Sequence, residues 1–489
     1  MIYRYQDFLI SLLSPFIRIS NHFSSKLRYR LITVCFIIDI ILFCIVRYLL
    51  HKDSYFYNTV CGIFIMVLIA FLSLDKQLVR IRWRRSVWLS WFGLCFAFTV
   101  SDLLVRKQAC GLGIVLAVVF TGVFFVWQNH SRQDLLWKCF KDAVKLAFLL
   151  MAVVAFCFRP YFEGGRYAGI FTNPNMFGLY LYVIFAVYIS DLDWIVQSGR
   201  SVKKSLWVHA QMALVVFFIF LSQARTSILA ISAIFTVWII CRIIVNHKQR
   251  AYRAFVKNLI LFFLSVLCLY PVFYLGITHI PKWINHPIVF QDDVLYMANG
   301  DKIEDIGDRI LAESTPQESV TVHEEEQKKD MVENNVIARF ISSMDGFDTL
   351  NRLSSGRITI YRAYLQRLNY KGHKNISMKI NGKKVAHAHN NWLQFGYTYG
   401  LFSMFFYGIV TVLSFVFSLK LYLKDYRVKG SYCFLPLAIS VGFLVATLTE
   451  CLFLPFELFP AFAFWFAFLD LFVKKVPKNR LTVQKELQV

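Results

Sequence analysis

Long apolar runs alternate with short basic segments along most of the chain. A helix needs about 20 apolar residues to cross a hydrocarbon layer of about 30 Å. About twelve runs approach this length, at 31–50, 55–74, 87–105, 109–127, 143–158, 176–190, 207–224, 226–244, 258–276, 401–420, 432–451 and 455–473. Lipid cannot satisfy backbone polar groups, and the alternating pattern of a membrane β-barrel is absent from the sequence. We therefore predict an all-α integral membrane protein with about twelve transmembrane helices.

The charge of the connecting segments predicts the orientation. The basic segments lie at 24–30, 75–86, 131–141, 199–204, 246–257, 420–429 and 474–480. If every run crosses, these segments share one side, which the positive-inside rule assigns to the cytoplasm. We therefore expect a multi-pass protein of the cytoplasmic (inner) membrane with both termini inside. Residues 1–30 are expected to form a cytoplasmic or interfacial amphipathic segment rather than a signal peptide, and 474–489 a cytoplasmic basic tail.

One long hydrophilic segment, 277–400, interrupts the apolar pattern. It separates the predicted spans of 31–276 from those of 401–473, and by alternation it faces away from the cytoplasm. Half of the acidic residues of the chain lie in it, and its later part predicts a helix over 355–368 followed by a turn at 369–375. The 11 Cys residues lie outside the stretch 277–388. A disulfide framework of the secreted type is therefore not expected.

Composition supports the membrane interpretation. Hydrophobic residues make up 57% of the 489 residues and charged ones 17%, whereas soluble domains average about 25% charged residues. The net charge of +23 comes from 53 Lys and Arg against 30 Asp and Glu. Because the cations lie mostly in short segments between apolar runs, they are typical of topology signals and membrane-lipid contacts. We expect no nucleic-acid partner.

The sequence contains no soluble catalytic signature. It lacks a phosphate-binding loop, a glycine-rich dinucleotide turn, an HExxH motif and a nucleophile elbow. The missing ATP site argues against a primary pump. Candidate chemistry therefore depends on polar residues at the ends of the predicted spans and in the hydrophilic segment, and we expect neither a cofactor nor a metal.

Two candidate positions precede predicted spans. Asn173, Pro174 and Asn175 form a turn before a span, and Arg166 lies close by. This turn could simply begin the helix, since Asn caps helices and Pro disfavours helix at the residue before it. Arg225 interrupts a long apolar stretch, so it is expected at the outer turn between two spans. It could snorkel to the interface, or it could face a cavity and bind phosphate oxygens.

Two further positions lie in the hydrophilic segment. Ser354, Ser355 and Gly356 predict a turn that begins a helix, with Arg357 in its first turn, either as a solvated side chain or as part of an anion site. His387 and His389 lie just before the tenth predicted span, and His389 is followed by Asn390 and Asn391. A helix beginning there would point the two imidazoles in different directions. They could be structural, they could be part of a metal site that lacks a clear third ligand, or one could accept a proton from a sugar hydroxyl.

Taken together, these motifs resemble the O-antigen ligase and O-antigen polymerase superfamily of membrane glycosyltransferases. Members share an R-x-x-x-L segment, here Arg225 to Leu229, and an S-G-R sequence, here Ser355 to Arg357. They also share H-N followed by Gly, here His389-Asn390 and Gly400, and relatives contain the Asn-Pro-Asn turn. The chain departs from the pattern at two positions, Tyr361, where relatives often have Trp, and Ser403, where ligases often have Gly, Thr or Tyr. The second departure weakens the assignment to a true lipopolysaccharide ligase.

The resemblance implies a GT-C-like fold and an inverting, metal-independent transfer. The donor would be a glycan on undecaprenyl diphosphate, and the acceptor another glycan or a lipid outside the cytoplasmic membrane. Arg225 and Arg357 would hold the diphosphate, and His389 would orient or deprotonate the acceptor. Other substrate contacts would come from Arg166, Asn173, Asn175 and Asn390.

Other functions stay open at this stage. A polysaccharide polymerase would use the same donor, and an oligosaccharyltransferase would transfer the glycan to protein. A transporter or flippase of lipid-linked sugars belongs to a different class and should place charges along a central cavity between related halves. Asp39 is the clearest acid within a predicted span, and the 277–400 segment breaks any symmetry between halves. A purely structural membrane protein would leave the arginine and histidine residues unexplained.

Overall fold

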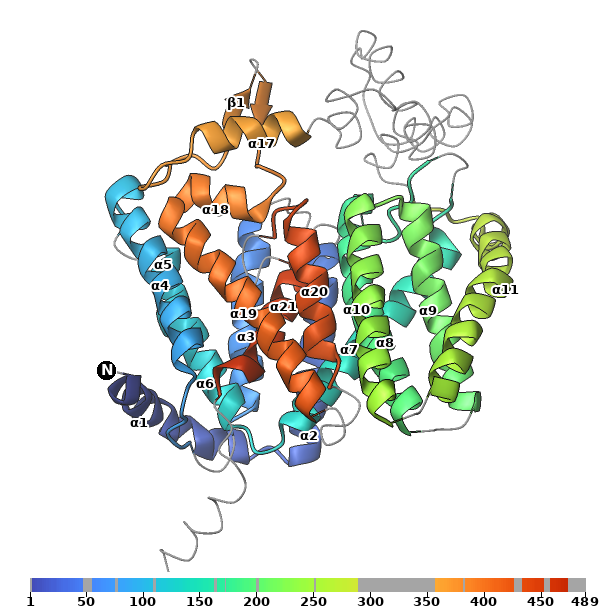
Figure 1. Cartoon of the computed structure of the whole chain (residues 1–489), viewed down its shortest axis with the longest axis horizontal. Coiled ribbons are helices and arrows are strands. Elements are labelled where there is room, and N and C mark those ends of the chain that lie inside the picture. The colour runs from blue at the N-terminus through green and yellow to red at the C-terminus, as the bar shows by residue number, and fades with distance from the viewer. Residues whose placement is uncertain are drawn as a thin grey trace, which may run out of the picture.

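The computed structural model describes residues 2–46, 55–74, 78–108, 111–161, 165–171, 173–198, 202–249, 252–288, 357–380, 383–425, 433–452 and 458–473. These residues form a bundle of long helices with a small layer of shorter elements at one end (Figure 1). The N-terminal helix α1 lies at the opposite end of the bundle.

The helices before the hydrophilic segment are α1 (Ile2–Asn21), α2 (Ser25–Cys44), α3 (Tyr55–Leu72), α4 (Arg85–Ser101), α5 (Leu112–Val115), α6 (Thr121–Asn129), α7 (Gln133–Phe158), α8 (Pro174–Ser198), α9 (Val202–Ser222), α10 (Arg225–Gln249) and α11 (Tyr252–Ile284). The π-helical turns η2 (Asp102–Arg106) and η3 (Leu116–Phe120) follow α4 and α5. The later elements are α17 (Arg357–Gln366), β1 (Met378–Ile380), β2 (Lys383–Val385), α18 (Asn391–Tyr399), α19 (Leu401–Asp425), α20 (Leu435–Thr447) and α21 (Phe459–Phe472).

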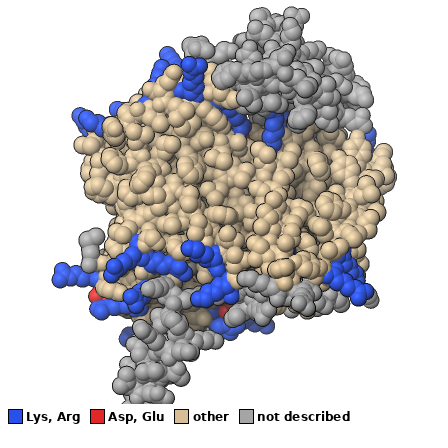
Figure 2. Space-filling view, viewed as in Figure 1, with Lys and Arg blue, Asp and Glu red and all other residues tan. Residues whose placement is uncertain are grey.

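The prediction of a mostly helical membrane protein is confirmed, whereas the number of spans and their orientation stay predictions. Each of the twelve apolar runs contains helix. Among the described residues, seven helical segments are long and apolar enough to cross a membrane: Arg85–Arg106, Leu112–Asn129, Pro174–Ser198, Ser205–Ser222, Arg225–His247, Tyr252–Ile284 and Leu401–Lys424. Figure 2 shows Lys and Arg gathered at the two ends of the visible face, with a belt of other residues between them.

The N-terminal helix and α11 differ in detail from the expected pattern. The predicted amphipathic segment is helical over Ile2–Asn21, with Phe8 and Leu12 exposed and Leu9 buried. Helix α11 continues to Ile284, beyond residue 276, where the apolar run ends. Its last turns carry Lys282 and an exposed Trp283. Such amphipathic residues suit the boundary between hydrocarbon and water. Because they are not strongly apolar, a prediction from hydropathy alone ends the helix too early.

The core of the bundle lies around α8 and α21. Helix α8 is buried along almost its whole length and packs against α9, α10 and α20. Helix α21 contributes closely spaced aromatic rings, for example Phe466, whose centroid lies 4.7 Å from that of Trp137 and 5.1 Å from that of Phe140. Large rigid rings fill space between helices with little loss of side-chain entropy, which explains why Phe is so abundant here.

A buried ionic cluster joins α8, α10 and α19. Asp193 Oδ1 accepts hydrogen bonds from Arg242 Nε at 2.5 Å, Trp238 Nε1 at 2.9 Å and the Tyr422 hydroxyl at 2.9 Å. Arg242 is 1% exposed, and its Nη2 also donates to the Asp193 carbonyl. A buried charge is tolerated when it is paired and hydrogen-bonded, as it is here.

The short elements after residue 356 form a separate outer layer, which we call the outer module (357–399). It contains α17, an antiparallel hairpin that pairs Met378 with Val385, and α18. The hairpin is absent from the sequence-based expectations, although Asn381 and Gly382 lie between its strands, and Asn-Gly is a strong hairpin signal. The outer module has its own small core, which includes Tyr364, Leu393 and Tyr397.

Arg106 fastens the outer module to the end of α4. Its guanidinium donates to the carbonyls of His373 at 3.1 Å and Thr398 at 2.9 Å, and it pairs with Asp102 at 2.8 Å. The same group lies 4.4 Å above the ring of Tyr399. One cation therefore positions both the turn after α17 and the end of α18.

Candidate functional site

The predicted site residues that the structure describes lie at the end of the bundle that carries the outer module (Figure 1). The loops after α9 and α20 also reach this end. The turn residues Ser354, Ser355 and Gly356 lie outside the described residues. Arg357 is the first residue of α17, in agreement with the predicted start of a helix.

Arg357 is held by the loop after α20. Its Nη2 donates to Glu450 Oε1 at 2.7 Å, and its Nη1 donates to the Thr449 carbonyl. The Arg357 side chain is 20% exposed and that of Glu450 is 11% exposed, so this ion pair is partly shielded from water. This geometry fixes the plane of the guanidinium and leaves its Nε edge as the part not used by these two contacts.

The same carboxylate lies next to His389. Glu450 Oε2 is 3.5 Å from His389 Nδ1, so the two oxygens of Glu450 face Arg357 and His389 respectively. Burial alone would raise the pKa of the Glu450 carboxyl, but the neighbouring His389 imidazole and the charge of Arg357 outweigh it and lower this pKa. Glu450 is therefore an anion that positions an imidazole and a guanidinium.

His389 has an unusual backbone conformation. Its φ is +50°, a value that residues other than Gly rarely adopt. Its carbonyl accepts a hydrogen bond from the Tyr361 hydroxyl at 2.9 Å, and the same hydroxyl lies 3.1 Å from the Leu448 carbonyl. Strained residues occur often at functional sites, where the surroundings hold them in place. Tyr361 thus connects α17 to this turn.

His387 lies beside His389 rather than pointing away from it. Helix α18 begins only at Asn391, so both histidines belong to the preceding turn, and the expected separation by a helix is wrong. Their ring centroids are 4.2 Å apart, and the His389 amide donates to His387 Nδ1 at 3.3 Å. Burial, followed by the neighbouring His389, lowers the pKa of His387 to about 4. His387 is therefore neutral at physiological pH.

Asn390 connects this turn to two other elements. Its side-chain oxygen accepts from the Leu393 amide at 3.0 Å and caps α18, while its Nδ2 donates to the Leu448 carbonyl at 3.0 Å. Both polar atoms of Asn390 thus have structural partners. The next residue, Asn391, is buried and donates to the Tyr407 hydroxyl at 2.6 Å.

The Asn-Pro-Asn turn forms a second polar group with Arg166. Asn173 Oδ1 accepts from the Asn175 amide at 2.8 Å, and Pro174 begins α8, so the turn does start a helix. Arg166 Nη2 donates to Asn175 Oδ1 at 2.6 Å, and its Nε lies 3.2 Å from the Ser222 carbonyl at the end of α9. These contacts place Arg166 at the α9–α10 turn.

Arg225 begins α10 directly after that turn. It is neither fully buried nor fully exposed, whereas Leu229 of the same motif is 53% exposed and faces outward. The next residue, Thr226, lies 2.8 Å from Thr449, hydroxyl to hydroxyl. Because Thr449 also contacts Arg357, the first turn of α10 and the first turn of α17 meet at the same loop.

Glu450 is the main residue that the sequence-based prediction missed. It is an acid near the end of the apolar run 432–451, and an acid in such a place has to be paired or coordinated, which is a detectable signal. Ser403, at which the expected motif differs, is buried and donates to the Gly400 carbonyl at 2.6 Å, so its described role is local. Within the described residues, no cluster of three His, Cys, Asp or Glu could hold a metal ion.

Comparisons of the chain with protein families, with curated proteins and with solved structures found no match.

Acidification is expected to loosen the turn around His387. A His with a lowered pKa resists protonation when folded, so the unfolded chain takes up the proton first and stability falls as pH drops from about 6.5 to about 4. The lowered pKa of Glu450 acts in the same direction at lower pH, since its stabilisation is lost as pH falls through the folded value. Unfolding temperatures measured from pH 7 to pH 4 should therefore decrease. They should decrease less in His387→Asn, which keeps an acceptor for the His389 amide and does not titrate.

Proposed function

We propose that the chain is a membrane glycosyltransferase of the O-antigen ligase type. It would transfer a glycan from undecaprenyl diphosphate to a glycan or lipid acceptor on the outer face of the cytoplasmic membrane. The observation that carries the proposal is that Glu450 holds both His389 and Arg357, while the loop that contains it also contacts the first turn of α10, where Arg225 lies. A base that shares a carboxylate with the guanidinium of Arg357, next to the helix start that carries Arg225, suits displacement of a diphosphate by a hydroxyl.

His389 would act as the base. Glu450 Oε2 lies 3.5 Å from Nδ1 and would favour a proton on that nitrogen, which would leave Nε2 to accept one, the role of an oriented histidine in general-base catalysis. The acceptor oxygen attacks the anomeric carbon, its proton passes to Nε2, and the bond from that carbon to the phosphate oxygen breaks. The bonding electrons leave with undecaprenyl diphosphate.

The arginines would stabilise the leaving diphosphate, whose negative charge grows as the bond breaks. Arginine suits this task because its planar fork matches phosphate oxygens. Arg225 begins α10, whose first turn meets the Thr449 loop. Arg357 would contribute the part of its guanidinium that Thr449 and Glu450 do not use. Arg166, with Asn173 and Asn175, would contact the donor next to the α9–α10 turn. No nucleotide energy source is needed, because the diphosphate bond is already activated.

The proposal requires about twelve spans with the outer module outside the cytoplasm. A reporter enzyme that works only outside the cytoplasm should be active when fused at residue 310. A reporter that works only in the cytoplasm should be active when fused at the C-terminus. These results follow from the basic connecting segments. The opposite pattern at both positions would place the site on the wrong side for the donor.

Transfer itself can be tested with purified protein in membranes that contain a glycan on undecaprenyl diphosphate. Product formation that requires an added lipid acceptor supports ligation, and growth of the glycan on its own carrier supports a polymerase. The wild type should work in the presence of EDTA. Absence of any covalent product with either acceptor class would contradict the proposed activity.

A transporter is the alternative that one described residue favours. Asp39 in α2 is 5% exposed, and its Oδ2 has no hydrogen-bond partner within the described part of the chain. Buried acids within membrane helices often belong to ion or substrate pathways. Movement of a labelled lipid-linked glycan across vesicle membranes without a covalent product, and its loss in Asp39→Asn, would support this alternative.

A further inference from the structure

Within the part of the chain that the structure describes, little covers one apolar face of helix α11, and this face begins with two cations. Of the seven candidate spans this helix is the least buried. Only 11% of an apolar 18-residue stretch of α11 is buried inside the protein, compared with 89% for α8. Its inward side is defined by Phe255, Asn258 and Phe262, which are buried against the bundle. Asn258 accepts a hydrogen bond from Ser205 of α9 at 2.5 Å. The orientation of the helix about its axis is therefore fixed.

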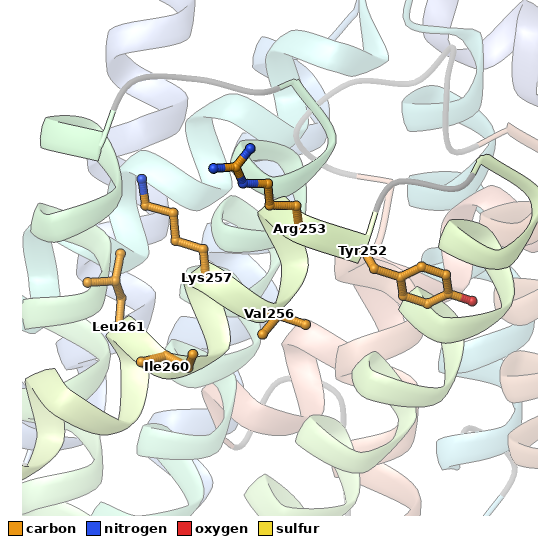
Figure 3. Close-up of a pocket in the computed structure, with 6 residues that line it drawn as sticks. All are labelled: Tyr252, Arg253, Val256, Lys257, Ile260 and Leu261. Carbon is orange, nitrogen blue, oxygen red and sulfur yellow. The ribbon is translucent and has the colours of Figure 1, made fainter.

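The opposite side carries the two cations at helical spacing. Arg253 and Lys257 are four residues apart, so they project from the same face, and both are exposed. Figure 3 shows their side chains extending in the same direction from α11, with Val256 and Ile260 beside them on the helix. These residues line a shallow groove with a volume of about 550 Å³.

The electrostatics of this end of α11 favour an anion. The helix begins at Tyr252, and its first turn contains no acidic residue. Backbone N–H groups at a helix start already carry partial positive charge, and Arg253 and Lys257 add to it rather than neutralise it. Between these cations and Lys282 in the last turn, the exposed face is mostly apolar, with Ile260 at 54% and Leu267 at 72% exposure. Charge at one end and a long apolar strip below it match the two parts of a phospholipid.

We propose that Arg253 and Lys257 bind the headgroup phosphate of an anionic phospholipid, whose acyl chains lie along Val256, Ile260 and the apolar strip beyond them. The hydrogen bond from Ser205 to Asn258 places this site near the start of α9, whereas Arg166 contacts Ser222 at the other end of α9. The lipid therefore sits in the leaflet opposite the candidate active site. Cations near a membrane surface attract anionic lipids, and the apolar strip adds area that a free phosphate would not use.

The test uses the full chain in nanodiscs of phosphatidylcholine containing a small fraction of phosphatidylglycerol. Mass spectrometry after mild detergent extraction measures the phosphatidylglycerol that stays bound per protein. We expect wild type to retain it in preference to phosphatidylcholine, and R253Q/K257Q to retain at least about tenfold less. The charge-preserving variant R253K/K257R should keep most of the binding. The single variants R253Q and K257Q should each show an intermediate loss.

The control is K26Q/R30Q, which removes an exposed pair of cations with the same spacing on α2. It should retain the lipid like wild type. Equal loss in this control would show diffuse attraction to a basic surface and would overturn the proposal. It would also be overturned by unchanged retention in R253Q/K257Q, or by a dimer whose cross-links at Ile260 show that a second copy covers the face. Each variant is first shown to keep the unfolding temperature of wild type in pure phosphatidylcholine. Transfer activity is not a readout, so the result is independent of the proposed function.

Discussion

Replacing His389 with asparagine is expected to lower the rate of glycan transfer about 10²–10⁴-fold, the usual cost of removing a general base. Asparagine is the informative substitution because it tolerates the left-handed φ of +50° at this position and can still hydrogen-bond to Glu450, but it cannot accept the acceptor proton. The measurement is single-turnover transfer with purified protein at saturating donor. Membrane insertion and unfolding temperature should stay close to those of wild type.

Two neighbours provide controls for this result. His387→Asn should retain most activity, because asparagine can still accept the hydrogen bond that the neutral His387 ring accepts from the His389 amide. Glu450→Gln should lose activity through the orientation of His389 and Arg357, so adding His389→Asn to it should cost far less than in wild type. Equal losses in His387→Asn and His389→Asn would contradict the assignment of the base, and inhibition by EDTA in addition would indicate a metal held by the histidines.

Arg225→Lys and Arg357→Lys are each expected to reduce transfer about 10²–10³-fold, the cost of losing one donor to a developing negative charge. Lysine keeps the charge but not the planar fork that pairs with phosphate oxygens. In Arg357→Lys the contacts to both Glu450 and the Thr449 carbonyl cannot be made together by one ammonium group in the same geometry. The measurement is kcat and KM for the lipid-linked donor, with kcat carrying most of the loss.

Arg362→Lys is the matched control, because Arg362 is exposed on the same helix α17. It should leave both constants near those of wild type. Full activity in Arg225→Lys and Arg357→Lys would contradict diphosphate binding by these residues. Arg225 would then be an interfacial residue, and Arg357 would have a purely structural role.

Hydropathy and local turn chemistry predicted much of this molecule. Apolar length located the helical runs, and the start of α17 at Arg357 and that of α8 at Pro174 follow from residues within a few positions of each. Glu450 was missed because its partner Arg357 lies 93 residues away, and no local pattern connects them. The pairing of the two histidines was missed for a related reason. Asn390 caps α18 through the Leu393 amide, so both histidines precede the helix, and Asn390 Nδ2 also donates to the distant Leu448 carbonyl.

The attachment of the outer module by Arg106 has a consequence for dissecting the protein. The module's own core is small, and the carbonyls of His373 and Thr398 are held by a side chain from a distant part of the chain. A soluble fragment comprising only 357–399 would lose that cation, together with the Glu450 contacts of Arg357 and His389. Antibodies raised against such a fragment would therefore recognise a surface that differs from that of the intact protein, and immunogens for this protein should retain α4 and the loop after α20.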